Sequence, residues 1–152
     1  FKGRKGTLYE GGIRVPFIVN QPGMVPIQTL DNLIYFPDMM PTLAALAKGT
    51  KHLPKQINGI NILPLFYGKQ VDTDNRLLYW EFPGKQRAAR KGDWKCVTIH
   101  PNQPLELYNL KEDPEETNNL AKKYPRRVKE FDEEMQRMHI PTPNWPQPGE
   151  QF

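Results

Sequence analysis

Four short runs in the second half of the chain are separated by turn residues, a pattern that is typical of antiparallel strands. The runs are residues 77–82, 86–91, 94–99 and 105–109. Pro83-Gly84, Gly92-Asp93 and residues 101–104 separate them, and a two-residue Gly-Asp connection is a hairpin signal. The pattern predicts a four-stranded antiparallel sheet.

Residues 38–47 have helical spacing instead. Asp38 is a candidate N-cap, Pro41 lies in the first turn, where an N–H would have no helical partner, and Gly49 is placed to end the helix. The apolar side of this helix is expected to consist of Met39, Leu43 and Leu46.

A second helix is predicted to begin at Pro125, a residue that is favoured in the first helical turn. Its apolar residues recur at helical intervals: Val128, Phe131, Met135 and Met138. This stripe predicts that the helix packs on one face of the sheet.

The first part of the chain predicts a loop and a strand. Residues 1–12 are rich in glycine, and residues 13–20 are rich in β-branched and apolar residues up to the turn Gln21-Pro22-Gly23. A near-continuous apolar run predicts a strand buried on both faces, for which this chain offers few neighbours. We therefore expect an α+β fold: a strand and helix from the edge of a larger α/β domain, then the sheet with its C-terminal helix.

The composition is that of a folded domain, because 38% of the 152 residues are hydrophobic and 25% are charged. The 16 prolines disfavour an all-helical bundle, and the single cysteine, Cys96, excludes an internal disulfide. No apolar stretch approaches the roughly 20 residues that span a bilayer. The residues from Phe1 onward contain neither an initiator Met nor the apolar core of a signal peptide, which favours an internal stretch of a longer protein.

The net charge of +4 arises within residues 76–100, which carry six cations against two acids. The cations are Arg76, Lys85, Arg87, Arg90, Lys91 and Lys95. Trp80 and Trp94 lie between them, and cations interleaved with aromatic residues can bind single-stranded nucleic acid or an anionic glycan. In the alternative, the Trp side chains face the helix and the cations face water. We do not favour nucleic acid as a partner.

Other reactive side chains lack the neighbours that chemistry requires. Cys96 has no nearby His to lower its pKa, which favours a half-buried strand thiol. The histidines are scattered without the spacing of metal ligands: His52, His100 and His139. Residues 72–75 resemble the start of a calcium loop, but the later Gly and Glu are missing, so a turn explains them better. We expect no metal site in this chain.

The most specific stretch is Lys5-Gly6-Thr7, followed by Tyr9-Glu10-Gly11-Gly12 and Arg14-Val15-Pro16. From the residues alone, it is a glycine-rich loop in which a cation can be held near an anionic group. The run resembles the formylglycine-dependent sulfatase family of the alkaline phosphatase superfamily. Further stretches are similar to that family, in the right order: 38–43, 58–65, 78–82, 90–95 and 106–120.

The resemblance implies the C-terminal portion of a sulfatase of the arylsulfatase or N-acetylgalactosamine-6-sulfatase type. Residues 1–75 would end the catalytic α/β domain, residues 76–140 would form a sheet-plus-helix subdomain, and residues 141–152 would be an extended Pro-rich tail. By resemblance, Lys5 is catalytic and binds the sulfate ester. Glu10 and Arg14 would support the loop.

In that family, a formylglycine derived from cysteine attacks sulfur, and calcium neutralises the sulfate. The motif around that cysteine is absent here, Cys96 does not match it, and the calcium ligands would precede Phe1. We therefore expect the isolated chain to be inactive toward sulfated carbohydrates or aryl sulfates and to work with the remainder of the sulfatase chain. The family implies a periplasmic or secreted location. A binding module that uses the basic sheet and a purely structural subdomain are the alternatives.

Overall fold

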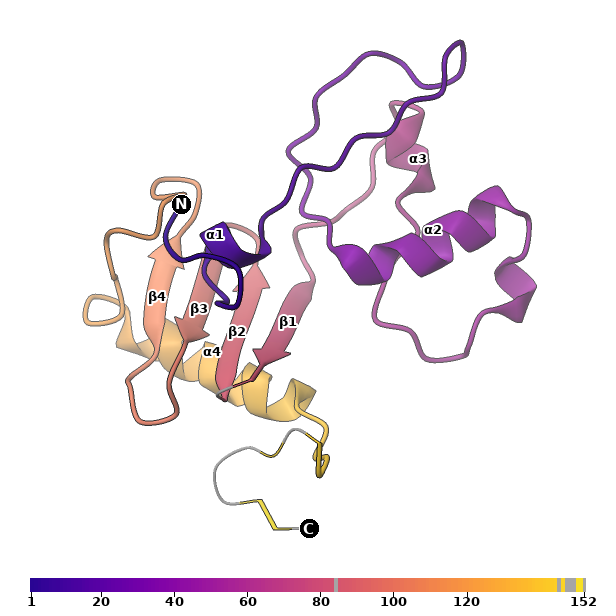
Figure 1. The fold of residues 1–152 in the computed structure, drawn as a ribbon. Coiled ribbons are helices and arrows are strands. Elements are labelled where there is room, and N and C mark those ends of the chain that lie inside the picture. The colour runs from indigo at the N-terminus through magenta and orange to yellow at the C-terminus, as the bar shows by residue number, and fades with distance from the viewer. Residues whose placement is uncertain (84, 145, 147–149, 152) are drawn as a thin grey trace. The chain divides into compact units, whose positions relative to one another are not determined.

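The computed structural model describes residues 1–83, 85–144, 146 and 150–151, and it divides into two compact units (Figure 1). The first unit consists of Phe1–Val15 and Arg76–Phe152, and the second consists of Pro16–Asn75. Residues 1–15 thus group with the sheet and not with residues 16–75. The assignment of residues 1–75 to a catalytic domain stays a prediction.

The first unit is built on an antiparallel sheet with the strand order β1-β2-β3-β4. Its strands are β1 (Leu77–Phe82), β2 (Gln86–Lys91), β3 (Trp94–Thr98) and β4 (Glu106–Asn109). Gly92 has φ +55 between β2 and β3, a left-handed conformation that a tight hairpin requires and that glycine adopts without a steric penalty. The predicted meander is confirmed.

Side chains alternate between the two faces of the sheet, and helix α4 (Pro125–Met138) covers one of them. On this face, Ala89 and Cys96 pack in one cluster with Phe131 and Met135 of the helix. The predicted C-terminal helix is therefore confirmed, and with it the α+β class.

The N-terminal residues 1–15 cover the opposite face of the sheet (Figure 1). Leu8 and Tyr9 are buried there against Ala88 of β2. Helix α1 (Glu10–Ile13) is a single turn that follows them. The glycine-rich motif thus lies directly on the sheet.

The strand expected at residues 13–20 is wrong, because Ile13 ends α1 and residues 14–20 form neither helix nor strand. A strand needs a neighbour for its backbone hydrogen bonds, and no strand of the described chain pairs with this segment. Val15 and Ile18 are 75% and 86% exposed. The apolar run is therefore not buried by the residues present here.

The second unit contains four short helical segments: η1 (Phe36–Asp38), α2 (Met39–Leu46), η2 (Thr50–His52) and α3 (Leu63–Phe66). Helix α2 confirms the predicted helix, but the Asp38 side chain does not cap it. Asp38 instead accepts hydrogen bonds from the N–H groups of Tyr35 (3.0 Å) and Ile60 (2.9 Å). Thr42 accepts one from the N–H of Ile62 (2.9 Å). These side chains hold the family-like stretch 58–65 against the start of α2.

Two details of α2 differ from the prediction. Lys48, and not Gly49, adopts the left-handed conformation after the helix (φ +56), and the N–H of Gly49 donates to the Ala44 carbonyl (2.7 Å). Leu43 and Leu46, expected on the buried side, are more than half exposed.

Residues 145, 147–149 and 152 of the predicted tail lie outside the described residues, and residues 141–144 form neither helix nor strand. In the described part of the chain, no helix is both long and apolar enough to cross a bilayer.

Candidate functional site

Lys5 lies in a four-residue turn from Arg4 to Thr7. The N–H of Thr7 donates to the Arg4 carbonyl oxygen (3.0 Å), and the Thr7 hydroxyl donates to the same oxygen (2.9 Å). Gly6 has φ +91, which favours glycine. Lys5 is exposed, and its side chain makes no hydrogen bond or ion pair with the residues that the structure describes. The motif thus builds a turn that presents a lysine to solvent.

Gly11 and Gly12 allow this turn to pack directly on α1. A Cβ atom on Gly12 would lie 2.0 Å from the Thr7 carbonyl oxygen, and one on Gly11 would lie 2.6 Å from the Lys2 carbonyl oxygen. Both positions overlap backbone atoms, which cannot move aside as a flexible side chain can. The paired glycines of the motif are therefore required by a close backbone approach.

Gln86, the first residue of β2, binds the backbone on both sides of Thr7. Its Oε1 accepts a hydrogen bond from the N–H of Leu8 (3.2 Å), and its Nε2 donates to the Gly6 carbonyl (3.0 Å). The amide is buried, so these bonds are sheltered from competing water. The sheet thus fixes the residue next to Lys5.

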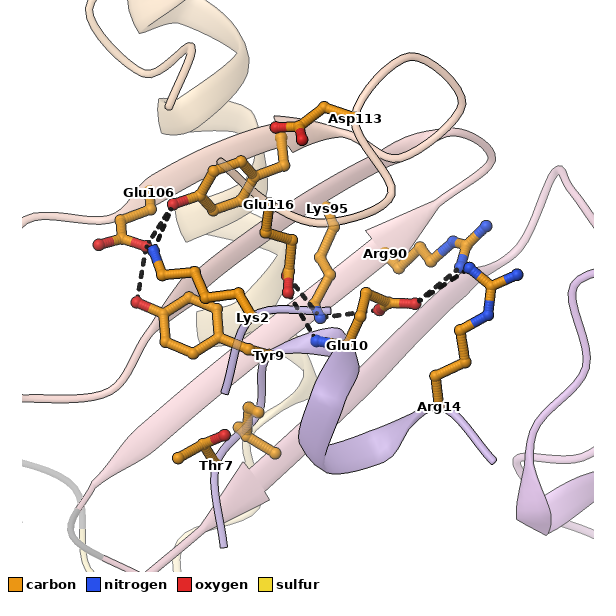
Figure 2. A network of polar contacts seen from close by, with 12 residues as sticks. Lys2, Thr7, Tyr9, Glu10, Arg14, Arg90, Lys95, Glu106, Asp113 and Glu116 are labelled. Atoms are coloured by element: carbon orange, nitrogen blue, oxygen red, sulfur yellow. Dashed lines mark hydrogen bonds and ion pairs between the residues drawn. The ribbon is translucent and has the colours of Figure 1, made fainter. Parts of the chain in front are cut away.

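A buried ion cluster joins α1 to the sheet (Figure 2). Lys95 Nζ donates to Glu10 Oε1 (2.8 Å) and lies 2.9 Å from Glu116 Oε1, as an ion pair without an aligned hydrogen bond. The backbone N–H of Glu10 donates to Glu116 Oε2 (2.6 Å). All three side chains are at most 4% exposed, and burial raises the pKa of Glu116 although Lys95 opposes this. The cluster stabilises the contact between α1 and the sheet because each buried charge is paired; removing one partner would leave an uncompensated buried charge.

Two arginines lie at the rim of this cluster (Figure 2). Nη1 of Arg90 and Nη1 of Arg14 are each 3.9 Å from Glu10 Oε2. Arg14 is the more exposed of the two, so water screens its contact more strongly. Together with Lys95, they surround Glu10 with positive charge.

A second polar cluster ties the start of the chain to β4 (Figure 2). Lys2 Nζ donates to Glu106 Oε2 (3.1 Å) and to the Tyr108 hydroxyl (2.8 Å). The hydroxyls of Tyr9 and Tyr108 each donate to the same Glu106 oxygen at 2.7 Å. Burial acts to raise the pKa of Glu106, but these hydrogen bonds outweigh it and hold the pKa below its ordinary value. An ionised Glu106 therefore fixes the segment that leads into the Lys5 turn.

Among the residues that the sequence singles out, the structure brings Glu10 and Arg14 together and leaves Lys5 in solvent. Sequence reasoning missed the sheet residues that hold the loop: Gln86, Lys95, Glu106 and Glu116. Three of these lie within the stretches 90–95 and 106–120, whose likeness to the sulfatase family was the available signal.

The basic residues of the meander do not form one face, so neither arrangement expected for them is found. Lys95 is buried, Arg90 is ion-paired with the N-terminal segment, and Arg87 is ion-paired with α4 (3.5 Å). Trp94 packs on the α4 side of the sheet, whereas Trp80 packs on the N-terminal side. These contacts divide the three cations between the interior and the two sides of the sheet.

The remaining candidates carry no catalytic arrangement. Within the described residues, no group of three or more His, Cys, Asp or Glu side chains could hold a metal ion. Asp72 instead closes a turn, accepting hydrogen bonds from the N–H of Asp74 (3.2 Å) and the amide of Asn75 (2.7 Å). Burial of Cys96 raises the pKa of its thiol to about 12, so it stays protonated at neutral pH.

The sequence profile of a known family and the fold define the class of protein. The chain belongs to the family described as N-sulphoglucosamine sulphohydrolase, C-terminal, whose sequence profile matches residues 4–140. It is a sulfatase C-terminal region, and its relatives are sulfuric ester hydrolases.

Individual relatives and a solved structure agree with this assignment. The chain is 32% identical to a sulfatase of Formosa agariphila over 139 residues, which are 80% of this chain and 25% of that protein. It is 29% identical to an N-acetylgalactosamine-6-O-sulfatase of Bacteroides thetaiotaomicron over 147 residues, 88% of this chain and 29% of that protein. A solved structure from work on glycosaminoglycan metabolism by B. thetaiotaomicron superposes with a TM-score of 0.73 at 28% identity, covering 88% of this chain and 30% of that chain. The chain spans about a quarter of the length of the first curated relatives.

Proposed function

We propose that this chain is the C-terminal part of a formylglycine-dependent sulfatase that hydrolyses sulfate esters of carbohydrates or aryl alcohols. One observation carries the proposal: a lysine of the family-like motif stands exposed in a turn whose backbone is held by the buried sheet residue Gln86. An exposed cation on a backbone that is held in this way is suited to bind a sulfate oxygen.

Lys5 would contact the sulfate ester and stabilise negative charge as the sulfur–oxygen bond breaks. Its ammonium carries three N–H donors and a compact charge, and such a group acts most strongly when it is held in place before the reaction. The Gln86 amide holds the end of the turn, the ion cluster around Glu10 holds the residues after it, and the contacts of Lys2 hold the residues before it, so the backbone that carries Lys5 is preorganised. Glu10 and Arg14 are thus proposed as loop supports.

The remainder of the sulfatase chain would supply the formylglycine nucleophile and the calcium site. Calcium prefers several oxygen ligands, and the described residues offer no suitable group, so we assign no step through calcium to this chain. Large apolar side chains exposed here support a covering partner of this kind: Val15, Phe17, Ile18, Ile27, Leu43 and Leu46. We place the full-length protein in the periplasm or outside the cell.

Sulfate release from 4-nitrocatechol sulfate by the full-length sulfatase that carries this chain tests the proposal. Replacing Lys5 by Ala should lower kcat/KM by about 10²- to 10³-fold, as the loss of one charge-stabilising donor does in other enzymes. The matched control is Lys69→Ala, which removes another exposed lysine and should leave kcat/KM unchanged. Unchanged kcat/KM in Lys5→Ala would overturn the role of Lys5. Sulfate release by the purified 152-residue chain would contradict the proposal that the nucleophile and the calcium site come from the remainder of the sulfatase chain.

A further inference from the structure

Four exposed or half-exposed cations cluster where the chain enters α4: Lys122, Lys123, Arg126 and Arg127. None of them has an ion-pair partner within the part of the chain that the structure describes. Two other cations of the same helix do, since Lys129 lies 3.8 Å from Glu133 and Arg137 lies 2.6 Å from Glu134. Positive charge is therefore left uncompensated at one end of α4 only. We call these four residues the α4 basic surface.

Aromatic rings hold two of these cations in place. The guanidinium of Arg127 lies 4.2 Å from the centre of the Trp94 ring, and Lys123 Nζ lies 5.4 Å from that of Tyr124. The two rings pack edge to face, with centroids 5.3 Å apart. A cation over a ring is positioned without being neutralised, so its full charge remains available to an external anion.

The α4 basic surface also slightly destabilises the helix on which it lies. The positive end of the helix dipole lies at the start of α4, where Arg126 and Arg127 occupy the first turn. Like charges at these positions destabilise the helix slightly, and the described residues supply no acid that pairs with them. Among the described residues, Glu130 is the one carboxylate that lines the shallow hollow formed by residues 123–127. An anion from outside would relieve this repulsion.

We propose that the α4 basic surface binds a sulfated glycan chain. This inference rests on the proposed function, because a polymeric sulfate ester would carry further sulfate groups beyond the one that is cleaved. The planar guanidinium groups of Arg126 and Arg127 present paired N–H donors that match the oxygens of a tetrahedral anion. Single-stranded nucleic acid is disfavoured, since the Trp94 and Tyr124 rings carry cations and do not form an open stacking platform for bases. The surface lies on the α4 side of the sheet, opposite to residues 1–15 (Figure 1).

Isothermal titration calorimetry of the 152-residue chain with a heparin oligosaccharide tests the proposal. Binding should weaken as salt is added, and unsulfated hyaluronan should bind at least about tenfold more weakly because it offers fewer charges. The variant Lys122→Gln, Lys123→Gln, Arg126→Gln should lose about tenfold or more in affinity for heparin, from the summed loss of three exposed charge contacts. It leaves Arg127 on Trp94, and its circular dichroism should match that of the wild type.

The matched control removes three exposed lysines from the other unit, Lys51→Gln, Lys55→Gln, Lys69→Gln, and so changes the net charge equally. It should bind heparin as the wild type does. The proposal is overturned if wild type does not bind heparin, if both triple variants lose affinity alike, or if single-stranded DNA binds more tightly than heparin. Sulfate release by the full-length protein with no heparin binding would contradict this inference alone, whereas heparin binding without sulfatase activity would contradict the proposed function.

Discussion

The backbone N–H of Glu10 donates a 2.6 Å hydrogen bond to the carboxylate of Glu116, which lies 106 residues later in the sequence. Glu116 adopts φ +58, a conformation that costs a non-glycine residue of order 1–3 kcal/mol. Its contacts with Glu10 and Lys95 must outweigh that cost. The N-terminal segment is therefore coupled to the loop that follows β4, although 106 positions separate the two residues in the sequence.

Replacing Lys95 by Met should lower the free energy of unfolding by about 3–5 kcal/mol, because two buried carboxylates would lose their shared cation. The triple variant Lys95→Met, Glu10→Gln, Glu116→Gln should recover much of that loss, since no unpaired charge remains. Denaturant unfolding followed by circular dichroism measures both. Lys129→Met, at an exposed lysine, is the control, and an equally small effect in Lys95→Met would contradict a buried cluster.

Replacing Gly12 by Ala should destabilise the first unit by about 1–3 kcal/mol or more, because the new Cβ would lie 2.0 Å from the Thr7 carbonyl oxygen. Gly49→Ala is the matched control: its Cβ would meet its nearest neighbour at an ordinary 3.7 Å. Thermal unfolding distinguishes them. Equal midpoints for Gly12→Ala and wild type would show that the loop does not pack on α1 this closely.

The fold should favour protonated His139. Burial acts to lower the pKa of His139, but hydrogen bonds to Glu81 (2.5 Å) and Glu150 (2.6 Å) outweigh it and raise the pKa. Tyr79 donates to the same Glu81 carboxylate, and Arg87 is the nearby cation. The stabilisation is therefore complete below the ordinary pKa of about 6.5 and is lost as the pH rises through the raised pKa.

An NMR titration of the His139 imidazole should give a pKa above the ordinary value in wild type. Glu81→Gln should lower it, because one of the two carboxylate partners loses its charge. A wild-type imidazole that titrates at or below the ordinary value would exclude this bridge.

Cys96 should be inert in the folded protein. It is fully buried, and desolvation raises the pKa of its thiol to about 12, so the reactive thiolate is scarce at neutral pH. Ellman's reagent should label it only in guanidinium chloride. Rapid labelling of the native chain would mean that the sheet and α4 do not enclose it.

The sequence predicted the elements whose pattern is local. The strands from 77 to 109 and the helix from Pro125 follow from short runs between turn residues, a Gly-Asp hairpin and a helical stripe, all of which act over a few residues. The apolar run at 13–20 does not identify its own partner, and without a neighbouring strand it forms no strand here. An apolar run alone therefore could not decide between a strand and an exposed segment.

The site was predictable only in part for a similar reason. Lys5, Glu10 and Arg14 were found because they lie in one short motif. The partner of Glu10 is Lys95, which lies 85 residues away and looked like one more surface cation of a basic meander. Lys95 is buried because it pairs with residues that are distant in the sequence. Counting charges along the chain cannot reveal such a contact.

The central claim is that the sheet positions the Lys5 turn through Gln86, and a double-mutant cycle in the full-length sulfatase tests it most directly. Gln86→Met should lower kcat/KM by about tenfold to a hundredfold, because the turn would lose both of its amide hydrogen bonds. Gln136→Met, at an exposed glutamine of α4, should have no effect. In the Lys5→Ala background, Gln86→Met should cost little more, since the lysine that it positions is already gone. A full, additive loss from Gln86→Met in that background would contradict the claim.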